Sequence, residues 1–276
     1  MNPLLPPVHL DAGRIVRASR SSFVPAFRLL SAERRRDLEL FYALCRELDD
    51  IADAGNHPAG HRYVALEAWR AGFRHPDFAG LPANVADLMR RRPLDRNLFL
   101  ELLDGVATDL LPSVRMATRA DLDVYCHRVA GTVGRLCLPI FGADRQRAGA
   151  YAETLGLALQ YTNILRDTAS DLRRGRIYYP LDELAAAGVD ETAFPVGSSA
   201  YLAGFAQEAN QLFEEAAKKL PTADREALKS ARIMASIYRS LLRKMQRDGM
   251  QVTEKHYRLS APQKLLAIGS VLIGHQ

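Results

Sequence analysis

The sequence predicts an all-α protein that folds as a single domain over residues 1–276. The alternation of apolar and polar residues that is typical of strands is scarce, and the long periodic segments follow a helical repeat. Residues that begin or end helices stand at several of the expected boundaries. The length would suffice for one large hydrophobic core or for two small ones. No low-complexity linker or internal repeat divides the chain, so we expect one domain.

The helical repeat assigns most of the chain to helices. We expect them at residues 22–30, 32–54, 60–74, 83–91, 95–110, 119–141, 146–174, 180–187, 198–219, 222–249 and 261–273. Ser31 can cap the second helix and Gly55 can end it. Thr118 and Asp121 have the spacing of a capping box before the sixth. Gly175 follows the long seventh helix, and Pro180 restarts the chain after "RIYY".

The last apolar segment, Leu265 to Ile273, is too short to span a bilayer. We expect it to pack as a terminal helix, in preference to lying on a membrane surface. The chain has no run of about 18 apolar residues, and its start lacks the pattern of a signal peptide. We therefore expect a cytoplasmic protein, with peripheral contact at a membrane surface left open. The three cysteines form no CxxC pair, so nothing indicates a disulfide framework or a zinc site.

The chain is basic, with a net charge of +5 and a pI of about 9.2. Its basic runs, at residues 34–36 and 90–92, would each be explained by an ordinary solvated helix face. The charge also suits an anionic membrane surface or a phosphate-bearing substrate. Nucleic acid is disfavoured as a partner, because aromatic residues do not interleave with these runs and no binding motif is present.

The stretch "CRELDDIAD" places acidic residues on a helix that should be buried. Tyr42, Arg46, Asp49 and Asp53 fall at i, i+4, i+7 and i+11, which is one continuous helical face. Carboxylates at i and i+4 lie roughly 6 Å apart. Their repulsion is on the order of 3 kcal/mol at an effective dielectric constant of about 20. In a cleft, such a pair requires a cation.

A second stretch, "LQYTNILRDTASDLRRG", repeats the pattern. Gln160, Asn163, Asp167 and Asp171 fall at i, i+3, i+7 and i+11, again among apolar residues. One DxxxD pair is common on solvated helix faces, but two pairs on otherwise hydrophobic helices point to a site. All of these ligand atoms are oxygens, no histidine stands at a useful spacing, and no Glu-x-x-His motif indicates a di-iron site. Hard oxygen ligands favour Mg²⁺.

The neighbouring Arg46 and Arg166 suit a phosphate or diphosphate group. The sequence therefore predicts a cavity in which two facing helices hold a diphosphate through Mg²⁺. Tyr178 and Tyr179 precede Pro180 and are expected in a simple turn, in preference to a lid, with Arg176 beside them in reach of a phosphate.

Three segments resemble the squalene/phytoene synthase family of head-to-head prenyltransferases: residues 21–53, "YCHRVAGTVG" and "LQYTNILRDTASDLRRGRIYYP". The resemblance extends from about Ser19 to about residue 265, and "ELLDGVATDL" also resembles a family segment. It implies an antiparallel helical barrel of the isoprenoid synthase type around a deep apolar cavity. Within the family, the chain looks most like the bacterial presqualene diphosphate synthases of hopanoid or squalene routes.

The resemblance also implies a set of roles. Asp49, Asp53, Asn163, Asp167 and Asp171 would bind Mg²⁺. Substrate would be held or walled by Arg46, Gln160, Arg166, Tyr238, Ser22, Phe23, Phe27, Val129 and Gly134. Tyr125, with Tyr42 alongside, would lie near the reacting carbons. Gly131 and Gly134 would either admit a prenyl chain or allow close helix packing, and the sequence does not decide between these.

The sequence departs from the family at one place that matters for the metal. Thr168, Ala169 and Ser170 stand between the paired aspartates, where the family usually has Val-Gly-Glu. We expect activity to persist, because both aspartates remain, with weaker metal binding from the missing glutamate.

The implied reaction joins two allylic diphosphates, and we favour two farnesyl diphosphates giving presqualene diphosphate, with a further step to a squalene-type C30 product open. The alternative is a phytoene synthase that uses geranylgeranyl diphosphate, on a route to carotenoids. NADPH use is undecided, since no Gly-rich dinucleotide motif is present but the reducing members lack a Rossmann fold too. A terpene cyclase is disfavoured by the paired aspartates of the second motif, and a non-catalytic assembly factor by the presence of all four aspartates. Downstream pathway enzymes are candidate partners.

Overall fold

The structure is a computed structural model that describes residues 4–19, 23–253 and 255–273. The prediction of an all-α fold is confirmed, since helices make up most of the described chain and the strands are two residues long. The elements are α1 (Ala12–Ser19), α2 (Val24–Phe27), α3 (Ala32–Asp53), α4 (Ala59–Arg74), α5 (Ala83–Arg91), α6 (Arg96–Thr108), β1 (Val114–Arg115), α7 (Arg119–Cys126), a π-helix (His127–Gly131), α8 (Thr132–Phe141), α9 (Arg145–Arg173), β2 (Arg176–Ile177), α10 (Leu181–Ala186), α11 (Ser199–Lys219), a 3₁₀-helix (Thr222–Asp224), α12 (Lys229–Arg247) and α13 (Ala261–Leu272).

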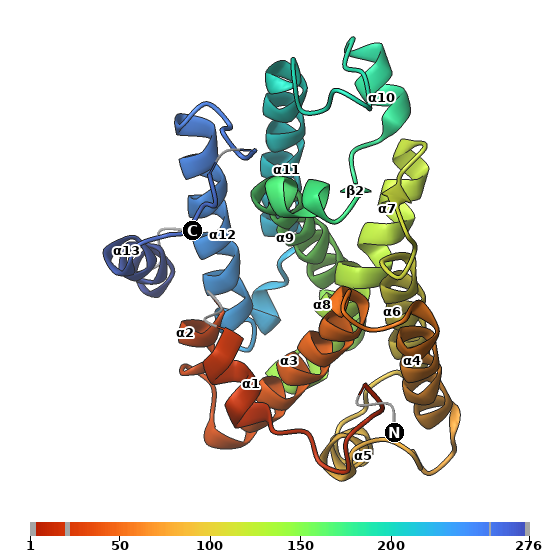
Figure 1. Cartoon of the computed structure of the whole chain (residues 1–276). Helices are drawn as coiled ribbons and strands as arrows, with labels where there is room; N and C mark the ends of the chain where they lie inside the picture. Colours follow the sequence, from red (N-terminus) through yellow and green to blue (C-terminus); the bar gives the residue numbers. More distant parts are fainter. Residues whose placement is uncertain (1–3, 20–22, 254, 274–276) are drawn as a thin grey trace.

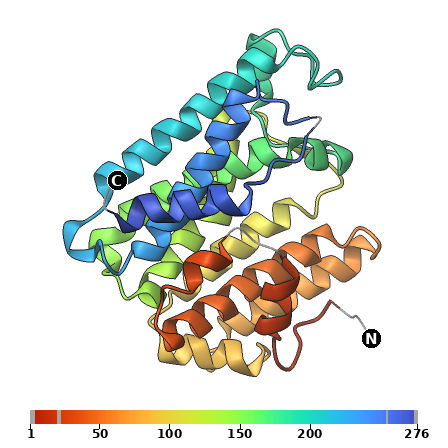
Figure 2. The same ribbon diagram turned by 90° about the vertical axis from the view of Figure 1, so that its left-hand side faces the viewer.

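The helices form a barrel-like bundle in which α8 and α9 lie in the middle. The helices α1 to α6 gather on one side of this pair, and α11 to α13 gather on the other (Figures 1 and 2). The long helix α9 packs against α8, α11 and α12, while α3 packs against α1, α4, α6 and α8. Of the two acidic helices, α3 therefore lies on one side of the bundle and α9 lies in its middle.

An aromatic core fills the half that contains α3, α4 and α6. Phe73 stacks on Phe99 with ring centroids 4.4 Å apart, and Phe41 meets Phe99 edge-on at 6.0 Å. Trp69 and Phe73 are both fully buried in this core. Because interiors are packed as densely as organic crystals, this core fixes the position of α3 and hence of its acidic face.

Most expected helix ends are found where the sequence places them. The Ser31 hydroxyl accepts a hydrogen bond from the Arg34 N–H at the start of α3, and Thr118 and Asp121 form the expected capping box on α7. Gly175 follows α9 with a φ of +73°, which is the left-handed conformation that favours glycine.

Four features differ from the sequence-based prediction. The short helix α1 and the strands β1 and β2 were not predicted, and the last of these strands contains Arg176. Within 22–30 the described helix is only Val24–Phe27. The single helix expected over 119–141 is interrupted by a π-helix. The segment 222–249 starts as a 3₁₀ turn, so α12 begins at Lys229. Short or irregular elements depend on contacts that a local pattern does not contain.

Glycines allow α8 and α9 to approach very closely. A Cβ atom at Gly134 would lie 2.3 Å from the main-chain oxygen of Ala152, and one at Gly156 would lie 2.4 Å from that of Ala130. Real Cβ atoms do not come so close to backbone atoms, so only glycine fits at both places. Gly134 therefore allows close helix packing, and it also lines the cavity described below, so its role beside a prenyl chain stays a prediction.

The strands β1 and β2 pair in parallel, with Val114 opposite Arg176 and Arg115 opposite Ile177. This pairing ties the chain that follows α9 to the chain that follows α6. The helix α13 packs along α12. In the described part of the chain, every helix is too short or too polar to cross a bilayer.

Candidate active site

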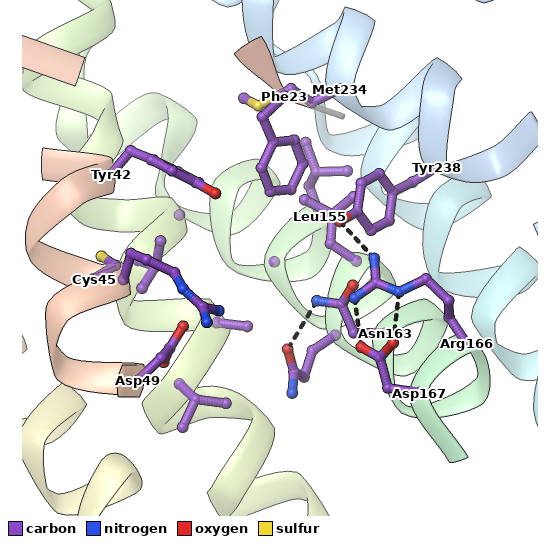
Figure 3. A pocket seen from close by; sticks show the side chains of 18 of the residues that line it. Phe23, Tyr42, Cys45, Asp49, Leu155, Asn163, Arg166, Asp167, Met234 and Tyr238 are labelled. Carbon is purple, nitrogen blue, oxygen red and sulfur yellow. Dashed lines mark hydrogen bonds and ion pairs between the residues drawn. The ribbon is translucent and has the colours of Figure 1, made fainter. Parts of the chain in front are cut away.

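A cavity of about 760 Å³ opens between α3, α9 and α12. It is lined by every predicted site residue that the structure describes. These are Phe23, Phe27, Tyr42, Arg46, Asp49, Asp53, Tyr125, Val129, Gly134, Gln160, Asn163, Arg166, Asp167, Asp171, Arg176 and Tyr238. Ser22 lies outside the described residues. The structure thus brings together residues that are up to 215 positions apart in the chain (Figure 3).

On α3, the helical repeat turns Asp49 and Asp53 toward the cavity. Asp53 is held by two arginines, with the Arg176 Nη1 atom 2.8 Å from its Oδ1 and the Arg174 Nη1 atom 3.2 Å from its Oδ2. Asp49 is open to solvent inside the cavity, but the protein around the cavity still desolvates its carboxyl group. This desolvation raises the pKa of Asp49 to about 7, with Arg46 opposing the shift.

On α9, Asn163, Asp167 and Asp171 face the cavity from the other side. Both oxygens of Asp167 accept hydrogen bonds from the guanidinium of Arg166. Desolvation, with the neighbouring Asp167 charge, raises the pKa of Asp171 to about 7. The Asn163 Nδ2 atom donates to Gln160 Oε1 at 3.3 Å, but the buried Oδ1 atom of Asn163 accepts no hydrogen bond from the described residues.

These groups suit Mg²⁺. Four carboxylates and one amide oxygen line the cavity, and Mg²⁺ prefers such hard oxygen ligands. Among the described residues, no three acidic, histidine or cysteine side chains already stand grouped around one metal position, so the carboxylates would have to move toward the ion. A buried carbonyl oxygen without a donor is costly, and a cation would compensate Asn163 Oδ1. The raised pKa values of Asp49 and Asp171 also indicate a cation site, because the charged form of each carboxyl group is disfavoured until a cation neutralises it.

Three arginines that line the cavity beside the carboxylates could hold an anionic group. Arg46 pairs with Asp50 at 2.6 Å on the same helix, and Arg166 donates to the Tyr238 hydroxyl at 3.2 Å. Tyr238 stacks on Phe23 with ring centroids 5.0 Å apart, which fixes the ring that supports Arg166 (Figure 3). Arg176 reaches the cavity from β2.

Asp109 is a site residue that the sequence analysis did not single out. Its carboxylate accepts hydrogen bonds from the Tyr125 hydroxyl at 3.0 Å and from the Tyr178 hydroxyl at 2.6 Å. Its main-chain oxygen accepts one from Arg176 at 3.0 Å. Burial raises the pKa of Asp109, against the opposing effect of the Tyr178 hydrogen bond.

The motif "ELLDGVATDL" contained Asp109, but it contains Asp104 as well, and that residue pairs with Arg70 at 2.7 Å away from the cavity. A local pattern does not separate the two aspartates. Tyr178, Arg174, Arg258 and Lys264 also line the cavity without having been predicted to.

The deeper walls of the cavity are apolar. They include Phe27, Leu38, Phe41, Leu138, Phe141, Leu155 and Leu228. The rings of Tyr42 and Phe27 meet edge-on with their centroids 5.9 Å apart, and Tyr42 also lines the cavity. A ligand with a charged head and a long hydrocarbon tail would match this division of the lining.

The three residues between Asp167 and Asp171 supply no carboxylate. The Thr168 hydroxyl lies 2.7 Å from the Tyr179 hydroxyl in a buried position, and the Ser170 hydroxyl donates to the main-chain oxygen of Asp167 at 2.8 Å. Both side chains thus serve the structure of α9, and on this helix the metal would rely on the two aspartates and Asn163.

The raised carboxylate pKa values predict how pH and Mg²⁺ act on stability. Between about pH 4 and pH 7, folded metal-free protein keeps protons on Asp49 and Asp171 that the unfolded chain has lost. Its stability therefore falls as pH rises through this window. Mg²⁺ binds the deprotonated groups, so it should raise the melting temperature more at about pH 8 than at about pH 6. Thermal melts with and without MgCl₂ at matched ionic strength test this, and equal shifts at both pH values would contradict it.

Comparison with known proteins agrees with the geometry. The squalene/phytoene synthase family model matches residues 16–264. A phytoene synthase of Mycobacterium tuberculosis is 36% identical over 268 residues, which cover 94% of this chain and 88% of that protein. A presqualene diphosphate synthase of Sinorhizobium fredii is 34% identical over 234 residues, which cover 80% of this chain and 82% of that protein.

Among solved structures, a dehydrosqualene synthase in complex with a ligand matches with a TM-score of 0.79 at 26% identity. The match covers 95% of this chain and 94% of that one. A squalene synthase from Alicyclobacillus acidocaldarius matches with a TM-score of 0.72 at 26% identity, over 86% of this chain and 92% of that one. The fold, the cavity and the sequence comparisons lead to one conclusion: the chain belongs to the squalene/phytoene synthase family of head-to-head prenyltransferases.

Proposed function

We propose that the protein condenses two farnesyl diphosphates head to head and forms presqualene diphosphate, with Mg²⁺ as its cofactor. The observation that carries this proposal is the cavity itself. Two aspartate pairs from α3 and α9 line it together with several basic side chains, and aliphatic and aromatic side chains make up much of the rest of its wall. A related presqualene diphosphate synthase and two structural neighbours named for C30 chemistry support the choice of C15 substrates.

The chain's own residues would bind and orient the substrates. Arg46, Arg166 and Arg176 would donate to diphosphate oxygens, and Tyr238 would hold the Arg166 guanidinium in place. Asp49, Asp53, Asn163, Asp167 and Asp171 would hold Mg²⁺. When bound, Mg²⁺ supplies Lewis-acid stabilisation of the departing diphosphate. The apolar walls would keep water away from the allylic cation that remains, and the rings of Tyr42 and Phe27 would face its charge.

A network around Asp109 offers a path for the proton that leaves. The C2–C3 double bond of the second substrate attacks the allylic cation at C1, and loss of a proton closes the cyclopropane. The Tyr125 oxygen would accept this proton while its own proton passes to Asp109, 3.0 Å away. Burial raises the pKa of Asp109 and so favours its protonated form. Tyr178 would orient the Asp109 carboxylate through the hydrogen bond to its other oxygen.

The second candidate is condensation of two geranylgeranyl diphosphates on the way to phytoene. It is favoured by relatives that are named phytoene synthase, one of them 36% identical to this chain. The two candidates share the binding groups and the ionisation step, and they differ only in the length of hydrocarbon that the walls must accept.

Incubation of purified protein with each substrate tests both candidates. With farnesyl diphosphate and Mg²⁺, and without NADPH, we expect a C30 cyclopropyl diphosphate and release of inorganic diphosphate, detected by mass spectrometry. Chelation of Mg²⁺ should abolish both, because the carboxylates then lack the cation that engages the leaving group.

A C30 hydrocarbon in that reaction would mean that the enzyme also performs a second ionisation. A C40 product from geranylgeranyl diphosphate, with none from farnesyl diphosphate, would replace the first candidate by the second. Absence of product from both, in protein with a cooperative thermal melt, would refute a prenyl transfer at this site.

A further inference from the structure

The helix α13 turns an apolar face to solvent. Leu265, Leu266, Leu272 and the following Ile273 have exposed fractions of 67, 76, 50 and 73%. Projected at 100° per residue, they occupy one arc of the helix together with Ala261 and Pro262. All the exposed residues from Ala261 to Ile273 are thus apolar. An ordinary surface helix has charged or polar side chains on this side, so a contiguous patch of this kind indicates a binding partner.

The opposite face of α13 is already used. Ala267 and Val271 are buried against the rest of the protein, and the Ser270 hydroxyl lies 3.2 Å from the Ser236 hydroxyl of α12. The start of α13 is capped by Ser260 and Gln263. Figure 2 shows α13, in dark blue, lying across the outside of α12. The helix is therefore well anchored, and no element in the described part of the chain covers its outward face.

The charge around α13 indicates what the partner is. Residues 243–264, which lead from the end of α12 into α13, include six lysines and arginines and two acidic residues. Their net charge of +4 accounts for most of the +5 of the chain, and no acidic residue follows position 254. Arg243 lies seven residues after Ser236 and hence on the side of α12 that meets α13. A second copy would bring the same positive charge, whereas an anionic lipid surface is complementary.

The same segment forms part of the cavity wall. His256, Tyr257, Arg258 and Leu259, which precede α13, line the cavity, and so does Lys264 within α13. A surface that receives the outward face of α13 would therefore lie close to the cavity. On the function proposed above, this would let a long-chain product pass to lipid with little exposure to water.

We propose that the outward face of α13, with the basic segment before it, docks the protein on an anionic lipid bilayer. The apolar side chains Leu265, Leu266, Leu272 and Ile273 enter the boundary between headgroups and acyl chains. The exposed basic side chains Arg243, Arg247 and Lys255, which do not line the cavity, meet the lipid phosphates. The contact is peripheral, since α13 has 12 residues and lies along the surface of the protein.

Vesicle sedimentation tests this proposal. Wild-type protein should bind vesicles that contain phosphatidylglycerol at least about tenfold more tightly than vesicles of phosphatidylcholine alone, and added KCl should weaken the binding. The double variant Leu265→Gln/Leu266→Gln should bind at least about tenfold more weakly than wild type, because two large apolar side chains are lost from the contact. Glutamine forms helices well, and both positions face solvent, so circular dichroism and the melting temperature should not change.

A matched control is available on α4. The double variant Tyr63→Gln/Val64→Gln removes two apolar side chains that are 58 and 54% exposed, and its vesicle binding should stay within about twofold of wild type. Equal loss in both variants, or no wild-type binding, would refute the proposal. If the wild-type protein bound no vesicles but formed a dimer, and if Leu265→Gln/Leu266→Gln dissociated that dimer, the apolar face would belong to a contact with a second copy instead. Turnover assays without vesicles test the proposed function separately.

Discussion

Replacement of Asp49 or Asp171 by asparagine should lower turnover at least about a hundredfold, which corresponds to about 2.7 kcal/mol of lost transition-state stabilisation. Each substitution keeps the shape of the side chain and removes a charged oxygen from one of the two facing carboxylate pairs. The diphosphate would then leave with a cation held by fewer charged ligands.

The same substitutions should not harm the fold. Desolvation raises the pKa of both carboxyls to about 7, so their charged forms destabilise the metal-free protein. Asparagine carries no charge and removes this destabilisation. Melting temperatures without metal should therefore equal or exceed that of wild type, while the added stability from Mg²⁺ should shrink. This opposite movement of stability and turnover is the expected sign of a binding site.

Glu47→Gln is the matched control for this experiment. Glu47 lies on α3 two residues before Asp49, it undergoes the same change from acid to amide, and it does not line the cavity. Its turnover should stay within about twofold of wild type. Turnover of wild-type level in Asp49→Asn or Asp171→Asn would remove that residue from the metal site.

Replacement of Gly156 by alanine should destabilise the fold by about 3 kcal/mol or more. The new Cβ atom would lie 2.4 Å from the main-chain oxygen of Ala130 and 2.8 Å from its carbonyl carbon. Neither atom is part of a flexible side chain, so α9 must move away from the π-helix that precedes α8. The free energy of unfolding from urea titration measures the effect.

Gly149→Ala is the control, because Gly149 lies on the same helix and a Cβ atom there would meet nothing within 4 Å. This variant should be neutral or up to about 1 kcal/mol more stable, as alanine is the better helix former. If Gly156→Ala were as stable as Gly149→Ala, the close packing of α9 against the π-helix before α8 would be wrong.

The two acidic faces could be read directly from the sequence. A helix repeats every 3.6 residues, so Asp49 with Asp53, and Asp167 with Asp171, must each share a face once the segments are helical. Their apolar neighbours also required both helices to be buried. The all-α fold followed from the same periodicity, and the squalene/phytoene synthase resemblance supplied Tyr125, Val129 and Tyr238.

The partners of these groups could not be read in the same way. Asp109 and Asp104 stand in one motif, yet one accepts hydrogen bonds from two tyrosines in the cavity and the other pairs with Arg70 away from it. Arg176 depends on the pairing of two strands that are only two residues long. Elements this short leave no periodic signal, and contacts across more than 60 positions are set by packing.

The sequence by itself determined most of the helices, the chemistry of the aspartate pairs and the family, because each rests on residue types at short spacing. Only the tertiary structure decided that Asp109 joins Tyr125 and Tyr178, that Gly134 and Gly156 let α9 approach its neighbours, and that α13 keeps an apolar face outside. A repeating pattern shows that a helix has an apolar side. Which side is covered, and by what, depends on how the other helices fill the space around it.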